Sequence, residues 1–254
     1  MPELIEAECY RVAAAELVGR TVSDVVVADP GYLRGAASAL LGQRIVAAER
    51  VGKVVVLRLD SGATVGLRFG MTGRLAVNGV AAVARLEYGP ATSELNWPQF
   101  TLSCDDGTTL VIDDPRRLGS VTVDIDLSAL GPDAASLTVT ELRSALGRSR
   151  SPLKARLLDQ SAIAGLGNLL ADETLWRASL DPLRPAISIT SAESARLALT
   201  VRQTVALLSR RGGSHLGDLQ QQRRRGGICP RCGRGLLRRS MAGRTTYSCP
   251  DEQR

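Results

Sequence analysis

The first residues of the chain combine an amine with carboxyl groups. Removal of Met1, which is usual before a small second residue, would leave Pro2 as a free secondary amine. An α-amine titrates near pH 8, so part of it is unprotonated at neutral pH and can attack an aldehyde-like carbon to form an iminium. Glu3 is adjacent and Glu6 follows a helical turn on, where a carboxyl group could move protons. The same residues also suit a plain helix start, so by themselves they leave both interpretations open.

Three of the five cysteines lie near the C-terminus with the spacing of a metal site. Cys229 and Cys232 form a Cys-X2-Cys knuckle, Cys249 follows after sixteen residues, and Glu252 stands where a second knuckle would have its fourth cysteine. The sixteen residues between Cys232 and Cys249 are long enough to form a β-hairpin that brings both pairs of ligands to one ion. Since a carboxylate is a harder ligand than a thiolate, a Cys3Glu site would hold zinc weakly. A hairpin that no longer binds metal is the alternative.

Charge is unevenly distributed along the 254 residues. Residues 1–200 carry 20 basic and 23 acidic residues, whereas the last 54 carry 12 arginines and three acids, a net charge of +9. This block indicates a polyanion partner, nucleic acid before membrane, because no apolar stretch of about 18 residues accompanies it. The chain start lacks the positive and apolar regions of a signal peptide, which predicts a cytoplasmic protein. Only Lys53 and Lys154 are lysines.

The hydrophobic pattern predicts an α+β multidomain chain. Residues 3–18 have helical spacing and stop at Gly19. Two strand hairpins are expected, at 53–60 with 64–69 and at 100–104 with 108–112, and helices at 138–146, 152–160, 168–178 and 192–210. The predicted domains are an N-terminal β-sandwich with a leading helix (1–122), a linker (123–137), a helical domain (138–222) and a C-terminal zinc-ribbon-like β-hairpin (223–254).

Short segments in one order along the chain match a single family. They are Met-Pro-Glu-Leu at 1–4, Gly-Lys at 52–53, Phe-Gly-Met-Thr-Gly at 69–73, Asp-Pro-Arg-Arg-Leu-Gly at 114–119, residues 164–173, Gly-Gly-Ser at 212–214 and Gly-Arg-Thr-Thr at 243–246. In these segments the chain resembles the bacterial formamidopyrimidine-DNA glycosylase and endonuclease VIII family of helix-two-turn-helix DNA repair enzymes. The resemblance implies a monomeric, nucleoid-associated, bifunctional DNA glycosylase and AP lyase that excises oxidised bases, purine lesions favoured, from duplex DNA.

The resemblance also implies catalytic roles for individual residues. Pro2 would attack C1′ of the damaged nucleotide and leave a Schiff base, with Glu3 as the acid/base group and Glu6 in support. Lys53 would hold a phosphate beside the lesion and assist β-elimination. Arg244, on the finger-like hairpin, would neutralise the phosphate that leaves in δ-elimination.

Five further residues are expected at the DNA. Met71, Arg116 and Leu118 match positions that fill the gap left by an everted base. Asn168 would grip a phosphate with backbone N–H groups at a helix start and with its side-chain amide. Lys154 would contact a phosphate or the lesion, with a solvated surface lysine as the equal alternative.

Several positions depart from the family pattern, among them Ile5, Leu118, Leu170 and Glu252. They bear on lesion reading and metal binding rather than on the chemical step. They leave open a second function, a non-catalytic protein that binds damaged DNA on the same scaffold. If the metal is absent, the hairpin that carries Arg244 is expected to be loose, which would lower DNA affinity more than the rate of chemistry.

Overall fold

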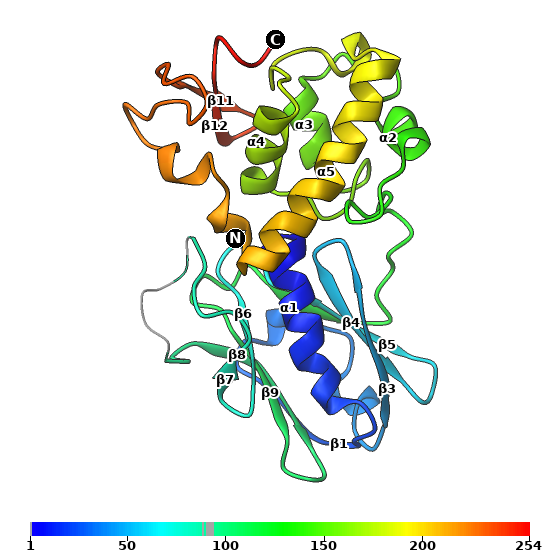
Figure 1. Cartoon of the computed structure of the whole chain (residues 1–254). Helices are drawn as coiled ribbons and strands as arrows, with labels where there is room; N and C mark the ends of the chain where they lie inside the picture. The colour runs from blue at the N-terminus through cyan, green and yellow to red at the C-terminus, as the bar shows by residue number, and fades with distance from the viewer. Residues whose placement is uncertain (1, 88, 90–93) are drawn as a thin grey trace. The chain divides into compact units, whose positions relative to one another are not determined.

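The computed structural model of the protein describes residues 2–87, 89 and 94–254 (Figure 1). The chain forms two compact units. The first contains Pro2 and Glu6–Ser128, and the second contains Glu3–Ile5 and Ala129–Arg254. None of the helices in the described part of the chain is long and apolar enough to cross a membrane.

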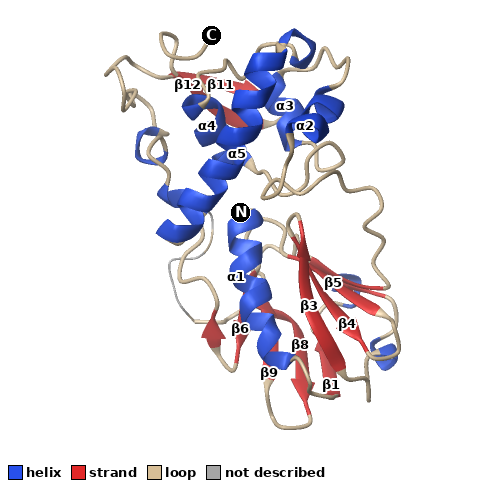
Figure 2. Cartoon of the chain, turned by 45° about the vertical axis from the view of Figure 1, so that its right-hand side comes forward, coloured by secondary structure: helices blue, strands red, loops and turns tan. Residues whose placement is uncertain are grey.

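The first unit is built on two five-stranded sheets among its described residues (Figure 2). The strands pair antiparallel, except that β10 runs parallel to β2. In spatial order, one sheet contains β1 (Val22–Val27), β8 (Pro98–Cys104), β9 (Thr109–Asp113), β6 (Arg74–Val77) and β7 (Val80–Ala81). The other contains β2 (Leu33–Arg34), β10 (Ser120–Val123), β5 (Thr64–Arg68), β4 (Val54–Leu59) and β3 (Ile45–Val51).

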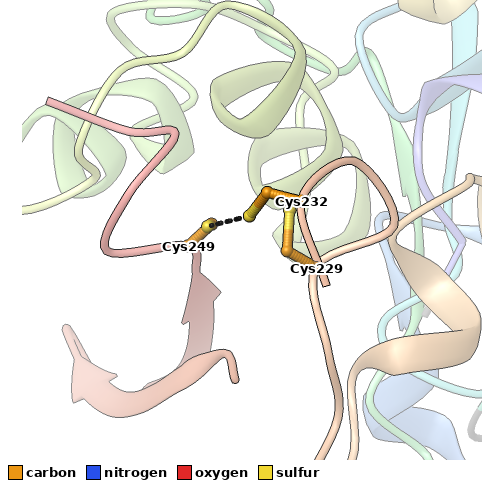
Figure 3. Close-up of side chains that lie close together, drawn as sticks. All are labelled: Cys229, Cys232 and Cys249. Atoms are coloured by element: carbon orange, nitrogen blue, oxygen red, sulfur yellow. Dashed lines mark hydrogen bonds between the residues drawn. The ribbon is translucent and has the colours of Figure 1, made fainter. Parts of the chain in front are cut away.

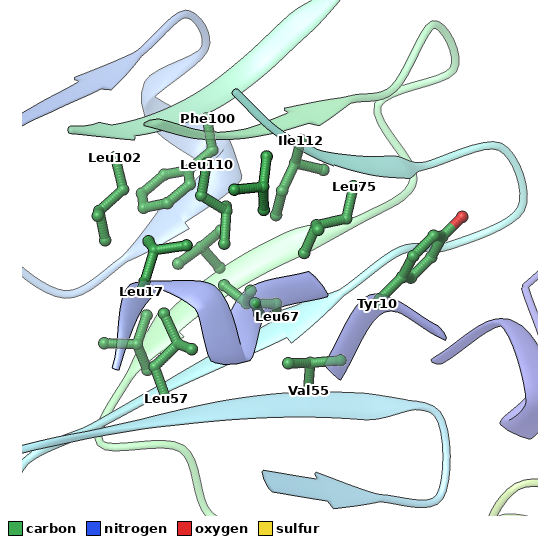
Figure 4. Packing of buried hydrophobic residues seen from close by; sticks show 14 of the residues in the cluster. Tyr10, Leu17, Val55, Leu57, Leu67, Leu75, Phe100, Leu102, Leu110 and Ile112 are labelled. Carbon is green, nitrogen blue, oxygen red and sulfur yellow. The ribbon is translucent and has the colours of Figure 1, made fainter. Parts of the chain in front are cut away.

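One helix contributes to the core of these sheets. Helix α1 (Leu4–Ala14) passes into a 3-10 turn at Ala15–Leu17, and the chain then turns at Gly19, whose φ of 91° favours glycine. Tyr10 and Leu17 are fully buried among side chains from both sheets (Figure 4). Burial of each such side chain contributes about 1.5–3 kcal/mol. The predicted β-sandwich with a leading helix is therefore confirmed.

The second unit contains four α-helices among its described residues. They are α2 (Val139–Leu146), α3 (Leu153–Leu158), α4 (Asn168–Arg177) and α5 (Ser191–Arg211), each within two residues of the predicted range. Thr138 and Thr190 begin α2 and α5 with complete capping boxes, and Gly212 ends α5 with a φ of 98°. Helix α4 is buried from Asn168 to Trp176, so polar residues on it must find partners inside the protein.

The second unit ends in a two-stranded hairpin. Strands β11 (Leu237–Met241) and β12 (Arg244–Ser248) are joined by Ala242 and Gly243, both with positive φ as a type I′ turn requires. A small apolar cluster of Trp176, Leu219, Cys229 and Cys249 lies beside the hairpin. The predicted C-terminal hairpin with its cysteine cluster is confirmed.

Candidate active site and metal centre

Glu3 lies at the N-terminus of helix α4. Its carboxylate is 0% exposed and accepts hydrogen bonds from the backbone N–H groups of Gly167 (2.9 Å), Leu169 (2.8 Å) and Leu170 (3.1 Å). The positive end of a helix with unpaired N–H groups stabilises an anion. The carboxyl group expected to move protons is thus held in one orientation by a rigid element.

The same contacts correct part of the prediction for Asn168. Backbone N–H groups at the start of this helix were expected to grip a phosphate, but those of Leu169 and Leu170 donate to Glu3. Asn168 itself is 7% exposed, and its Oδ1 has no hydrogen-bond partner within the described ranges. A phosphate contact by the Asn168 side chain stays a prediction.

Pro2 and Glu6 lie at the start of helix α1. Pro2 is buried directly before the helix, and Glu6, in its first turn, is 2% exposed. The burial of Pro2 and of the Glu6 carboxyl group shields both residues from bulk water, as the predicted chemistry needs. Their roles stay predictions.

Lys53 occupies the turn between strands β3 and β4. Gly52 precedes it with a φ of 58°, and glycine at the first central position is typical of a type II′ hairpin turn. Arg50 donates to the Gly52 carbonyl (2.8 Å) and to Glu8 (3.1 Å), which fixes the strand end. The half-buried Lys53 is therefore presented from a rigid two-residue turn.

Two loops carry the predicted gap-filling residues. Arg116 Nη1 lies 3.6 Å from Met71 Sδ, and Leu118 is 50% exposed. A Cβ on Gly70, whose φ is 55°, would lie 2.4 Å from the Leu118 carbonyl carbon, so these loops approach each other at a glycine. The structure thus brings Met71, Arg116 and Leu118 onto one pair of loops.

Asp114 holds this pair of loops together, although only its place in a motif was noted from the sequence. It is 0% exposed and accepts from Thr72 Oγ1 (2.7 Å), Gly119 N (2.8 Å) and Tyr32 Oη (3.3 Å). Burial, and then Asp114, raise the pKa of Tyr32 well above its ordinary value. The neighbouring Asp113 pairs with the buried Arg74 at 2.7 Å. In the sequence, the two adjacent acids at the end of a buried strand were the signal that could have predicted these internal contacts.

Lys154 is neither a surface lysine nor a free DNA contact. Its side chain is 0% exposed, and its Nζ lies 2.6 Å from Asp172 Oδ1 on helix α4. Burial lowers the pKa of Lys154, while Asp172 opposes that shift. Both interpretations of Lys154 from the sequence are therefore wrong, because neither considered an acid buried in the following helix.

The arginine run after residue 222 is also not wholly solvated. Arg223 Nη2 lies 3.0 Å from Asp172 Oδ2, and its side chain is 5% exposed. Glu173, the next residue of α4, accepts from the backbone N–H groups of Asp218 (3.1 Å) and Leu219 (2.9 Å). Two adjacent acids in an apolar helix were the signal for these internal roles.

The three C-terminal cysteines converge (Figure 3). Their sulfur atoms all lie within 4.8 Å of one another, and the Cys232 and Cys249 sulfurs are 3.5 Å apart. Burial raises the pKa of Cys249 to about 11. Burial would also raise the pKa of Cys229, but hydrogen bonds from Trp176 and nearby backbone N–H groups lower it on balance. Three soft sulfur donors at this spacing fit a tetrahedral zinc ion.

Glu252 is not brought into this group in the described part of the chain. Its carboxylate lies 3.6 Å from Arg231 Nη1, the arginine inside the first knuckle. Arg231 also lies over the Trp176 ring at 4.2 Å. A fourth ligand from Glu252 therefore needs this ion pair to open, and it stays a prediction.

Both units resemble domains of one known protein family. The model of the formamidopyrimidine-DNA glycosylase N-terminal domain matches residues 1–121, and that of the formamidopyrimidine-DNA glycosylase H2TH domain matches residues 129–217. The formamidopyrimidine-DNA glycosylase of Thermus thermophilus is 36% identical, with 98% of this chain and 97% of the relative covered. That of Acidiphilium cryptum is 33% identical, with both chains covered completely.

Solved structures agree with these matches. The MutM (Fpg) protein from Thermus thermophilus superposes with a TM-score of 0.83 at 34% identity, covering 99% of this chain and 98% of that one. Lactococcus lactis Fpg (MutM) in a complex with Fapy-dG-containing DNA has a TM-score of 0.82 at 23% identity, covering 99% of each chain, a likeness in fold alone. The sandwich, the helical unit and the cysteine-bearing hairpin define a helix-two-turn-helix DNA repair fold. The chain belongs to the formamidopyrimidine-DNA glycosylase family, which confirms the resemblance.

Proposed function

We propose that the protein is a bifunctional DNA glycosylase and AP lyase that excises oxidised bases, purine lesions favoured, from duplex DNA as a monomer. Family membership supports the glycosylase class. The observation that carries the proposal is Glu3, a buried carboxylate fixed by three N–H groups one residue after Pro2. A positioned carboxyl group beside an amine is the arrangement that imine chemistry requires.

In the proposed reaction, Pro2 is the nucleophile once Met1 has been removed. Its nitrogen bonds to C1′ of the damaged nucleotide while the bond between C1′ and the base breaks, and the departing base takes a proton from water. Glu3 accepts the proton that the Pro2 nitrogen loses and passes it to the sugar ring oxygen as the ring opens, which gives an iminium. Glu6, buried in the next helical turn, supports the charge balance of this step.

Strand cleavage follows from the iminium by elimination. Loss of a C2′ proton breaks the bond between C3′ and its phosphate oxygen, and Lys53 stabilises the charge on that phosphate. A second elimination releases the 5′ phosphate, whose charge Arg244 neutralises; a guanidinium is a poor proton donor at neutral pH. Water then hydrolyses the imine and regenerates the Pro2 amine.

The remaining site residues bind the duplex in this proposal. Met71, Arg116 and Leu118 fill the gap left by the everted nucleotide, and the Asn168 side chain contacts a phosphate. Zinc on Cys229 and Cys232 with Cys249 stiffens the two knuckles, with the fourth position taken by water or by Glu252. These contacts account for binding, whereas Pro2 and Glu3 account for the chemistry.

Borohydride trapping on duplex DNA with one 8-oxoguanine or one abasic site tests the proposal. We expect a covalent complex whose cross-linked peptide maps to Pro2 by mass spectrometry, and none with an undamaged duplex. Protein with confirmed removal of Met1 that binds lesion DNA without trapping or cleavage would contradict catalysis and support a non-catalytic damage-binding protein.

A further inference from the structure

One buried acid on helix α4 collects two cations. Asp172 is 0% exposed, and its two oxygens lie 2.6 Å from Lys154 Nζ and 3.0 Å from Arg223 Nη2. Lys154 comes from helix α3, and Arg223 follows the 3-10 turn at Gln220–Gln222. We call Lys154, Asp172 and Arg223 the ionic cluster.

The ionic cluster is bonded to strand β12. Lys154 Nζ donates to Thr246 Oγ1 at 2.9 Å and to the Thr245 carbonyl at 3.4 Å. The Tyr247 N–H donates to Asp172 Oδ2 at 3.3 Å, and the Arg223 guanidinium lies 5.4 Å from the centre of the Tyr247 ring. The contacts therefore fall on the three residues that directly follow Arg244.

A second set of contacts docks the first cysteine knuckle on the end of the same helix. Trp176 Nε1 donates to Cys229 Sγ at 3.3 Å, and Arg231 Nη1 donates to the Trp176 carbonyl at 2.9 Å. Arg231 Nη2 also donates to the Arg177 carbonyl at 3.2 Å. These bonds need no metal ion, and arginine at the negative end of a helix is favourable.

We infer that the ionic cluster positions Arg244 by fixing strand β12 to helix α4, so that the hairpin keeps its place whether or not zinc is bound. Loss of Asp172 would leave two cations buried without a counter-charge, which is far more costly than loss of an exposed pair. Lys154 and Asp172 are thus positioning residues for Arg244. This replaces the expectation that the hairpin is loose without metal, and for Arg244 it rests on the proposed function.

Hydrogen exchange of the hairpin tests the inference without reference to activity. Amide exchange over residues 237–248 is measured by mass spectrometry in the full chain, loaded with zinc and after chelation. We expect chelation to change the rate less than about threefold, and D172N to raise it about tenfold or more in both states. Chelation that matches D172N, or D172N without effect, overturns the inference.

Asp218 offers a matched control within the same unit. It also pairs with two arginines, Arg177 and Arg211, but its side chain is 41% exposed. Among the described residues, no hydrogen bond or ion pair joins this side chain to the hairpin. We expect D218N to leave exchange over 237–248 unchanged. K154M, which leaves Arg223 on Asp172, should raise the exchange rate by a smaller factor, and it serves if D172N does not fold.

Coupling to Arg244 separates positioning from general destabilisation. On abasic DNA at saturating enzyme, R244A and K154M should each lower the fraction of δ-elimination product, and the double variant should lower it no further than R244A alone. Additive losses would mean that Lys154 does not act through Arg244, which overturns the positioning role. Loosened exchange in D172N with unchanged products from both D172N and R244A would instead refute the proposed role of Arg244 and leave the docking intact.

Discussion

Asp114 in the first unit and Asp172 in the second are both fully buried carboxylates that tie a loop or hairpin to a scaffold. Asp114 does so with neutral donors, two hydroxyl groups and backbone N–H groups. Asp172 does so with two cations and one backbone N–H group. The difference matters because a neutral donor that loses its acceptor costs a modest free energy, whereas a buried cation that loses its anion costs much more.

Each of the two arrangements also suits the residues that it holds in place. The loops around Asp114 present Met71, Arg116 and Leu118, which in the proposed function enter the base stack and so need a precise backbone. The cluster around Asp172 supports Arg244 on a hairpin that forms a two-stranded sheet among the described residues. A small element without a core needs a strong anchor, and a metal ion or an ionic cluster can supply it.

The largest effect should come from D172N. Because Lys154 and Arg223 would remain buried without a counter-charge, we expect the free energy of unfolding of the second unit to fall by about 3–5 kcal/mol. Urea unfolding in a W97F background would report it, since Trp176 is then the only tryptophan and lies in this unit. D218N should lower the same free energy of unfolding by about 1 kcal/mol or less. Equal losses in the two variants would break the comparison.

A smaller loss is expected for D114N. The amide keeps one acceptor oxygen in place of two and leaves the donors to the other oxygen unsatisfied, so the first unit should lose about 1–3 kcal/mol. Hydrogen exchange over 69–73 and 114–119 should rise while exchange over 237–248 stays constant. D105N, in an exposed turn, is the control. A loss larger than that of D172N would show that buried charge is not what distinguishes the two sites.

E252C tests how much the metal adds to the anchor. A fourth thiolate completes a four-cysteine set, so zinc affinity should rise about tenfold or more in competition with a chromophoric chelator. E252Q, which removes the charge facing Arg231 without adding a sulfur, should leave affinity within about threefold. No gain for E252C would mean that the 252 side chain cannot reach the three sulfurs.

The smallest effect is expected at a partly buried acid. Glu193 caps helix α5, and Arg184 and the Thr190 N–H lower the pKa of Glu193 from its ordinary 4.5 to about 2. A lowered pKa stabilises the fold above pH 4.5, and this contribution is lost as pH falls towards 2. The difference in unfolding free energy between wild type and E193Q, about 1 kcal/mol or less at pH 7, should shrink over that window. A difference that grows on acidification would contradict the assignment.

Much of the fold could be predicted from local patterns. The helix before Gly19, both sheet hairpins and all four later helices follow from periodicity, caps and turn residues, which act over a few positions. Strands β1 and β6 were not predicted, because their pairing with β8 and β9 depends on partners distant in the chain. Strand β3 was also not predicted, although its partner β4 follows it directly. The cysteine spacing likewise predicted the convergence of three sulfurs.

The amino-acid sequence by itself determined all the α-helices, two sheet hairpins, the family and the residues that carry the proposed chemistry, because these depend on residue type and short spacing. Only the tertiary structure decided which charges are internal. Glu3 accepts from N–H groups at the helix start where a phosphate was predicted, and Lys154 and Arg223 pair with Asp172. The physical reason is that a charge is buried only where folding brings an opposite charge or several N–H groups to it, and that juxtaposition spans distances that no local pattern records.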